Sequence, residues 1–156
     1  SLAPPDAALS RLNGVIKLMN SESVNGERVI DNPIFRDRLM KIQGRVLAMK
    51  CNDMRLLSAR INKGQDAKLA GMIVKLLGTE LRHELEALAI DVMGEIGIAY
   101  GDNPYLRGNG SWQYQYMLFL GLIIGGGTSQ IQKNIISERG LGMPREPKPA
   151  AKANAS

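Results

Sequence analysis

The fold is decided by PIFRDRLMKIQGRVLAMKCNDMRLLSARINKGQDAKLAGMIVKLLGTELRHELEALAIDV, which runs from Pro33 to Val92. In each half, apolar residues recur every three or four positions, the spacing of one helix face. Lys63-Gly64 is a stop signal for the first helix, and Asp66 is a candidate N-cap for the second. Two long helices joined by so short a turn must run antiparallel. The two stripes are Ile34, Leu39, Ile42, Val46, Met49, Met54, Leu57 and Ile61, then Leu69, Ile73, Leu77, Leu81, Leu85, Leu88 and Val92.

The flanking segments complete a helical chain. Residues 5–20 repeat the helical spacing, whereas residues 21–33 have turn-formers at both ends and no helical period, which predicts a connector. Residues 94–111 hold too many glycines for regular structure and predict a loop. The segment 112–124 is compatible with a buried helix or a strand, and its helical neighbours favour the helix.

A short last helix follows three consecutive glycines and extends to Arg139. Its start fits an S-x-x-Q capping box of Ser129 and Gln132, with Thr128 as the competing cap one residue earlier. We therefore predict an all-α antiparallel helical bundle of four long or medium helices plus a short C-terminal helix. The domain is expected to cover residues 1–142, followed by a flexible Pro/Ala-rich tail over residues 143–156.

Composition limits the functional classes. The formal net charge is +5, but the basic residues are interleaved with acids and the few aromatics form no stacking array, so nucleic-acid binding is not expected. The longest apolar run, Met117–Ile124, is too short to span a membrane. A single cysteine and no leader peptide indicate a cytoplasmic protein. Cys51 is interpreted as a small buried hydrophobe, and His83 as part of a solvated face with no metal site.

The triglycine, Gly125 to Gly127, has two interpretations. Glycine followed by a capped helix presents free N–H groups and the positive end of the helix dipole, which suits a phosphate or another anion. Alternatively, the glycines only relieve crowding in a tight turn between helices. The run lacks both the G-x-G-x-x-G spacing and the lysine of a P-loop, and the pattern alone does not decide.

Two segments carry a family resemblance. The run GGGTSQIQKNIISERGLGMPR, residues 125–145, closely resembles the C-terminal signature of FAD-dependent acyl-CoA dehydrogenases, G-T-x-x-I-Q followed by N-I-I-x-E-R-x-L-G-x-P-R. The run ALAIDVMGEIG, residues 87–97, is similar to the family's A-x-Q-x-x-G-G-x-G. The resemblance implies an excised C-terminal helical domain, without the family's N-terminal helical domain and middle β-domain.

The same resemblance implies cofactor contacts. Gly127, Thr128 and Gln130 match positions that face FAD, and Arg28 matches the arginine of an R-x-T-F-G motif that reaches the FAD of a neighbouring subunit. Ile30, Asp31 and Asn32 depart from the rest of that motif. Asp91 stands where the family commonly has glutamine, and its charge would repel a pyrophosphate.

The resemblance also implies an activity. Many members carry the catalytic Glu directly before G-T, where this chain has Gly126, so no catalytic residue is assigned. The base is expected upstream of Ser1, with Asp6, more typical of a helix N-terminal charge, as the fallback. The parent would oxidise an acyl-CoA to its trans-2-enoyl-CoA with FAD and pass electrons to an electron-transferring flavoprotein.

The fragment itself is expected to be free of FAD, inactive, and a homodimer or higher oligomer. The departures from the family pattern also fit a branch that works in mixed-subunit assemblies. The alternative function is a helical oligomerisation module without a competent active site.

Overall fold

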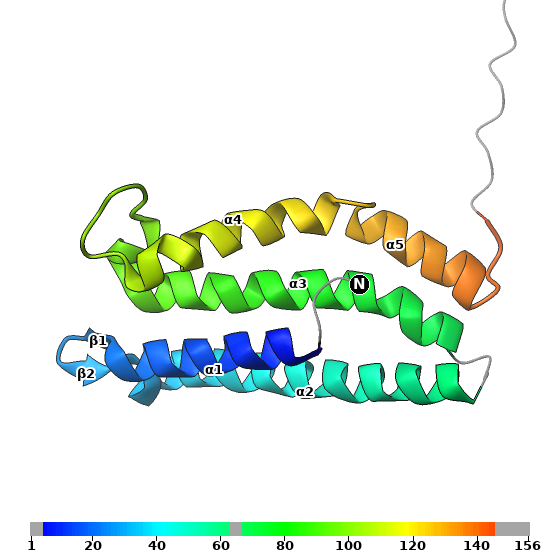
Figure 1. Cartoon of the computed structure of the whole chain (residues 1–156), viewed down its shortest axis with the longest axis horizontal. Helices are drawn as coiled ribbons and strands as arrows, with labels where there is room; N and C mark the ends of the chain where they lie inside the picture. The colour runs from blue at the N-terminus through cyan, green and yellow to red at the C-terminus, as the bar shows by residue number, and fades with distance from the viewer. Residues whose placement is uncertain (1–4, 63–66, 146–156) are drawn as a thin grey trace, which may run out of the picture.

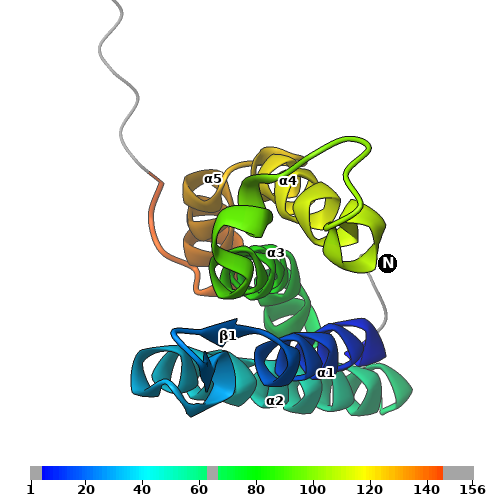
Figure 2. The ribbon, with the colours of Figure 1, turned by 90° about the vertical axis from the view of Figure 1, so that its left-hand side faces the viewer.

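The computed structural model describes residues 5–62 and 67–145, which form an antiparallel helical bundle (Figures 1 and 2). α1 and α2 lie side by side, α3 crosses above them, and α4 and α5 follow one another along the other side of α3. The predicted all-α bundle is confirmed. The helices are α1 (Pro5–Ser21), α2 (Pro33–Ile61), α3 (Ala67–Met93), α4 (Ser111–Ile124) and α5 (Ser129–Ile135).

α2 begins where the sequence predicts. The Asn32 side chain accepts hydrogen bonds from the amides of Ile34 at 2.9 Å and Phe35 at 3.3 Å, while Pro33 occupies the first turn, where its missing N–H costs nothing. The expected stop at Lys63-Gly64 and the expected cap Asp66 lie outside the described residues.

The connector after α1 contains a small hairpin. Strands β1 (Ser23–Val24) and β2 (Glu27–Arg28) pair antiparallel. Between them, Asn25 and Gly26 have φ angles of 53° and 83°, as a two-residue type I′ turn requires. A 3₁₀ turn, Val29–Asp31, then leads to α2 and buries Val29. The lack of a helical period predicted the end of the helix, but strands this short carry no alternation from which to predict them.

The core lies where α1, α2 and α3 meet, and it extends under α4 through Trp112. The predicted stripe of α2 is buried only at Leu39, Ile42 and Val46. Ile34 at its start is 70% exposed, and Met54, Leu57 and Ile61 at its end are 61%, 60% and 72% exposed. The end of α2 is exposed because it extends beyond the start of α1, and no helix among residues 5–62 and 67–145 covers that face (Figure 1). The buried members of the three helices are Leu12, Val15, Leu18 and Met19; Leu39, Ile42 and Val46; and Leu81, Leu85, Leu88, Ala89, Val92 and Met93.

Two single-residue interpretations are wrong. Cys51 is exposed rather than buried, because it lies on the same uncovered part of α2. His83 does not lie on a solvated face: its ring stacks on Tyr116 with centroids 4.8 Å apart, and its Nδ1 atom is buried. The reason is that α4 packs over the face of α3 that carries His83.

The expected loop and the ambiguous apolar segment have more structure than predicted. The 3₁₀ turns Gly94–Ile98 and Arg107–Gly110 bracket the loop, and Arg107 pairs with Glu22 at the end of α1. The apolar segment is a helix, as favoured. Beyond α5, a π-helical turn, Ile136–Gly140, completes the expected last helix, and Arg145 pairs with Glu138 at 3.1 Å. No helix within the described ranges is long and apolar enough to cross a membrane.

Candidate functional site

The candidate site is the turn between α4 and α5, residues 125–128, which we call the α4–α5 turn. Gly126 and Gly127 adopt φ angles of 71° and 109°, a region that side chains other than glycine rarely occupy. A Cβ atom on Gly127 would lie 2.9 Å from Nε2 of Gln132. Glycine is therefore favoured at residue 127 chiefly for its backbone angle, and a side chain there would also push the Gln132 amide off its bond to the Gly126 carbonyl.

Thr128 begins α5. Its hydroxyl accepts a hydrogen bond from the Ile131 amide at 3.4 Å, so the competing cap Thr128 is confirmed and the capping box with Ser129 as the cap is wrong. Ser129 instead donates to Oε1 of Glu80 at 2.7 Å, because α3 lies directly beneath it. Within the described residues, the backbone amides of Ser129 and Gln130 donate to no acceptor. These two N–H groups remain available to an anion or another acceptor.

A lysine that the sequence patterns did not single out holds the α4–α5 turn. Nζ of Lys75, on α3, donates to the carbonyl oxygens of Ile123 at 3.0 Å and Gly127 at 2.6 Å. Nε2 of Gln132 donates to the Gly126 carbonyl at 2.9 Å. A signal was present in the sequence, because Lys75 is the one charged residue in the run GMIVKLLG, residues 71–78. A lone charge in such a run needs a polar partner when the helix is packed on both sides.

The other two expected cofactor residues lie far from this turn. Arg28 is on the hairpin and Asp91 is near the end of α3, at the end of the molecule opposite α5 (Figure 1). Arg28 pairs with Asp31 at 2.9 Å, and Asp91 pairs with Arg38 at 2.7 Å. One chain therefore presents Gly127, Thr128 and Gln130 over the middle of α3, and Arg28 and Asp91 at the end of the bundle where α3 finishes (Figure 1). Arg38, whose charge offsets that of Asp91, was not expected from the sequence.

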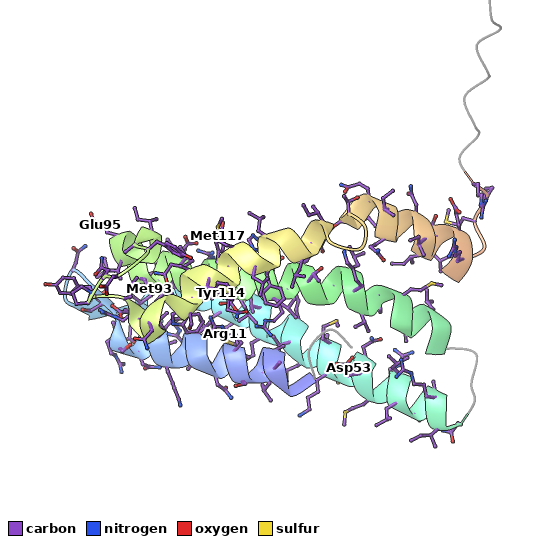
Figure 3. The ribbon with its side chains drawn as sticks, turned by 45° about the horizontal axis from the view of Figure 1, so that its top comes forward. Arg11, Asp53, Met93, Glu95, Tyr114 and Met117 are labelled. Atoms are coloured by element: carbon purple, nitrogen blue, oxygen red, sulfur yellow. The ribbon has the colours of Figure 1, made fainter. Side chains whose placement is uncertain are left out.

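A buried ion cluster joins α1, α3 and α4. The carboxylate of Glu86 is fully buried and accepts from Arg11 through two bonds of 2.7 Å, while Arg82 lies 3.5 Å away. The guanidinium of Arg11 lies 3.6 Å from the ring centre of Trp112. The position of Arg11 can be followed in Figure 3. Since both its oxygens are occupied and no solvent reaches it, Glu86 does not replace the base that Gly126 lacks.

Burial in this cluster shifts the pKa of Arg82. Burial of its guanidinium lowers the pKa of Arg82 below the usual value, and the like charge of Arg11 lowers it further, while Glu86 raises it. The Nε atom of Arg82 is buried without a hydrogen-bond partner, and its guanidinium lies 4.5 Å from the ring centre of Phe119. This cluster therefore fixes how α1 and α4 sit on α3.

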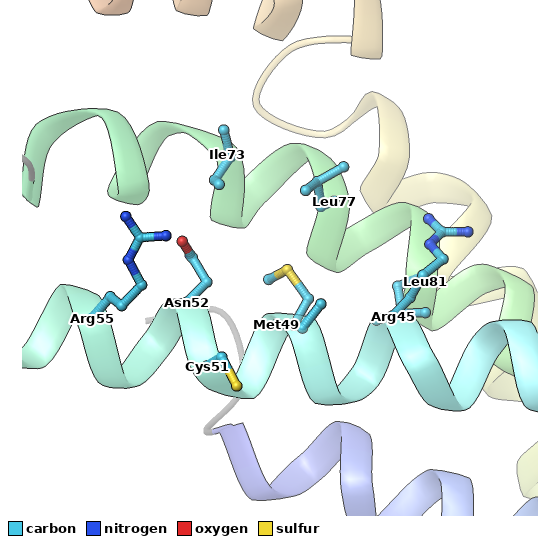
Figure 4. Close-up of a pocket in the computed structure, with 9 residues that line it drawn as sticks. Arg45, Met49, Cys51, Asn52, Arg55, Ile73, Leu77 and Leu81 are labelled. Atoms are coloured by element: carbon cyan, nitrogen blue, oxygen red, sulfur yellow. The ribbon is translucent and has the colours of Figure 1, made fainter.

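Several hollows lie away from the α4–α5 turn. One of about 220 Å³ beside the hairpin has the expected cofactor residue Arg28 on its wall. Two larger ones lie elsewhere. A groove of about 370 Å³ between α2 and α3 is lined by apolar side chains together with Arg45 and Arg55 (Figure 4). A second hollow of about 530 Å³ lies beside α4, with Tyr100 and Tyr114 on its wall. Neither contains an expected site residue, and the described residues hold no group of three metal-ligating side chains.

Comparison with known proteins defines the family. The acyl-CoA dehydrogenase C-terminal domain matches residues 7–141. The chain therefore belongs to that family, as its sequence signature predicted. It is 34% identical over 120 residues to acyl-CoA dehydrogenase IpdE1 of Mycobacterium tuberculosis, covering 76% of this chain and 29% of that protein. It is 27% identical over 132 residues to acyl-CoA dehydrogenase FadE26 of the same organism, covering 81% of this chain and 32% of that protein.

Solved structures agree with this assignment. The ChsE4-ChsE5 complex from Mycobacterium tuberculosis superposes with a TM-score of 0.76 at 26% identity, covering 94% of this chain and 37% of that chain. The Tcur3481-Tcur3483 steroid ACAD superposes with a TM-score of 0.75 at 20% identity, covering 91% and 35%, which shows a shared fold. The chain spans about a third of the length of these relatives.

Proposed function

We propose that this chain forms the flavin-facing helical part of an FAD-dependent acyl-CoA dehydrogenase, which oxidises an acyl-CoA to its trans-2-enoyl-CoA. The observation that carries the proposal is the α4–α5 turn, where glycines, a threonine cap and two available amides begin a helix on the surface. Thr128 and Gln130 are exposed and Gly127 is partly exposed, so a bound group could approach them.

The residues fit a flavin at this position. The amides of Ser129 and Gln130 would donate to the flavin or its phosphates, and the exposed Gln130 side chain would add a contact. The hydroxyl of Thr128 already caps α5, so its part is to fix the direction of those amides. When bound, FAD would supply the chemistry of accepting a hydride from the substrate.

The proton-abstracting carboxylate must come from elsewhere. Gly126 has no side chain, and the carboxylate of Glu86 is enclosed by arginines. We propose that the base is supplied by protein outside residues 1–156, in the same polypeptide or in a partner subunit, with Asp6 as the fallback within this chain. The similar ChsE4-ChsE5 complex pairs two differently named proteins, which supports an assembly in which one chain completes the site of another. An electron-transferring flavoprotein would receive the electrons.

A second candidate function is a helical oligomerisation module. The observation that favours it is the uncovered apolar end of α2, where Met54, Leu57 and Ile61 face solvent. The two functions are compatible if α2 builds the assembly while the α4–α5 turn contacts the cofactor.

Flavin absorbance tests the proposal. Purified residues 1–156 should be colourless and inactive, because a flavin held only at the start of α5 would face water on its other side. The complete enzyme should retain FAD, and Gln130→Ala should weaken its binding about three- to tenfold, the effect of one lost hydrogen bond. Lys133→Ala, an exposed change on the same helix, is the control. A complete enzyme without flavin, or Gln130→Ala with unchanged affinity, would count against the proposal.

A further inference from the structure

The conformation of the α4–α5 turn is set by contacts from outside it. Glycine has no side chain with which to lock a backbone and loses more conformational freedom on folding than any other residue. Two of the turn's residues, Gly126 and Gly127, sit at positive φ. The turn's own backbone bonds are few: Gly125 to Gly121 at 2.9 Å and Gly127 to Ile124 at 3.2 Å. Other groups must therefore hold the turn.

Lys75 is placed to do this. It is partly buried on α3, and its ammonium bridges the last turn of α4, through Ile123, to Gly127, the residue before the α5 cap. Hydrogen bonds from a charged donor are roughly twice as strong as neutral ones. The ammonium also lies at the C-terminal end of α4, where the helix dipole favours a positive charge.

A second tether comes from the same helix. Glu80 of α3 accepts from the Ser129 hydroxyl at 2.7 Å, just after the cap. The two tethers fix Gly127 and Ser129 on either side of Thr128. The direction in which the Ser129 and Gln130 amides point is therefore set by the two α3 tethers together with the Thr128 cap, and not by the glycines themselves.

We infer that Lys75 is a positioning residue: by holding the Ile123 and Gly127 carbonyls, it aims the first amides of α5. Its consequence for cofactor binding rests on the proposed function, whereas its effect on the turn does not. Lys75 itself does not touch the reacting atoms. Its ammonium lies on the α3 side of the turn and acts through the backbone of residues 125–130.

Amide hydrogen exchange of residues 1–156, followed by NMR, tests the effect on the turn. In Lys75→Met, the Gly127 and Gln132 amides should exchange about tenfold faster or more, since a hydrogen bond from a charged group is lost. Core amides such as Leu85 should keep their rates. Lys75→Arg, which retains a charged donor, should restore most of the protection. Lys50→Met, on an exposed face of α2, is the matched control.

Either of two results would overturn the inference. One is unchanged exchange of Gly127 and Gln132 in Lys75→Met. The other is faster exchange throughout the molecule with a lowered melting temperature, which would show a role in general stability only. If Lys75→Met does not fold, Lys75→Gln replaces it, with a smaller local increase expected because Gln keeps a neutral donor, and with the same two contrary results.

FAD affinity of the complete enzyme separates this inference from the proposed function. Lys75→Met should bind FAD about tenfold more weakly, and Lys75→Arg should bind it nearly as well as the unmodified enzyme. If the turn loosens while FAD affinity stays unchanged, the positioning role toward the cofactor is overturned. If the unmodified enzyme binds no FAD, the proposed function fails, and the exchange measurement alone decides whether Lys75 sets the turn.

Discussion

At the residue scale, the most constrained side chain is Glu86. Its carboxylate is fully buried and shared by two arginines from different helices. A buried ion pair adds little net stability compared with an apolar pair of similar volume, but removing one partner leaves an uncompensated charge. Glu86 therefore specifies how α1 and α4 pack on α3.

Glu86→Gln should lower the free energy of unfolding by about 3–5 kcal/mol, because Arg11 and Arg82 would remain close together without a counter-charge. Urea denaturation followed by circular dichroism measures the change. Glu84→Gln is the control, because Glu84 pairs with Arg45 near the surface and should cost no more than about 1 kcal/mol. Equal effects of the two substitutions would mean that burial of Glu86 does not govern its contribution.

Asp53, on α2, supplies a pH-dependent prediction. Burial raises the pKa of Asp53 above the usual value, so the ionised carboxylate costs stability in the folded protein. This cost exists when pH is above the folded pKa and disappears as pH falls below the unfolded pKa. Asp53→Asn should therefore melt at a higher temperature than the unmodified chain at about pH 7, and the difference should vanish near pH 3.

Differential scanning calorimetry across that pH range measures the effect. Asp37→Asn is the control, because Asp37 pairs with Lys41 at 2.6 Å and its loss should not stabilise the chain at neutral pH. A lower melting temperature for Asp53→Asn at neutral pH would show that Asp53 has a favourable interaction that outweighs its burial.

At the element scale, the α4–α5 turn depends on glycine at one position and not at another nearby. Gly127 has a φ of 109° and lies against Gln132, whereas Gly121 lies within α4 with open space where a Cβ would be. Replacing glycine with alanine should therefore change the free energy of unfolding in opposite directions at the two positions.

Gly127→Ala should lower the free energy of unfolding by about 1–2 kcal/mol, the cost of a side chain at positive φ. Gly121→Ala should raise it by about 0.5–1 kcal/mol, because alanine is the better helix former. Thermal and urea denaturation of both variants measure the two changes in the free energy of unfolding. A stabilising Gly127→Ala would mean that the turn relaxes to another conformation without cost.

The elements themselves were largely predictable, and the exceptions have physical causes. Helical spacing and the position of Pro33 predicted α1, α2 and α3 within a few residues of their observed ends, because these signals are local. The hairpin was missed because its strands are only two residues long. The choice of Thr128 over Ser129 as the α5 cap depended on Glu80, which is distant in sequence.

At the scale of the whole molecule, the uncovered end of α2 is the main surface feature. The stripe that continues the core into Met54, Leu57 and Ile61 has no neighbour within the described chain. On the short α5, Ile131 is 50% exposed. Large contiguous apolar patches are rare on monomeric proteins and mark association sites, for which twofold symmetry is the commonest arrangement.

We expect a homodimer or higher oligomer held by the long helices, with α5 near the contact. Light scattering at micromolar concentration should give at least twice the 17.0 kDa chain mass. Leu57→Lys should shift the chain toward monomer, whereas Ser10→Lys, the same added charge at an exposed position of α1, should not. A strictly monomeric unmodified chain would refute this expectation.

The sequence alone determined the helices, their antiparallel order and the family, because apolar spacing, helix stops and the signature around Thr128 are all local patterns. It placed Gly126, Gly127, Thr128 and Gln130 in one short run, so that part of the candidate site was predictable. The tertiary structure alone decided that Arg28 and Asp91 lie at one end of the bundle, away from that run, which lies over the middle of α3. It also revealed the Lys75 and Glu80 tethers and the burial of Glu86, because these depend on which helix faces meet.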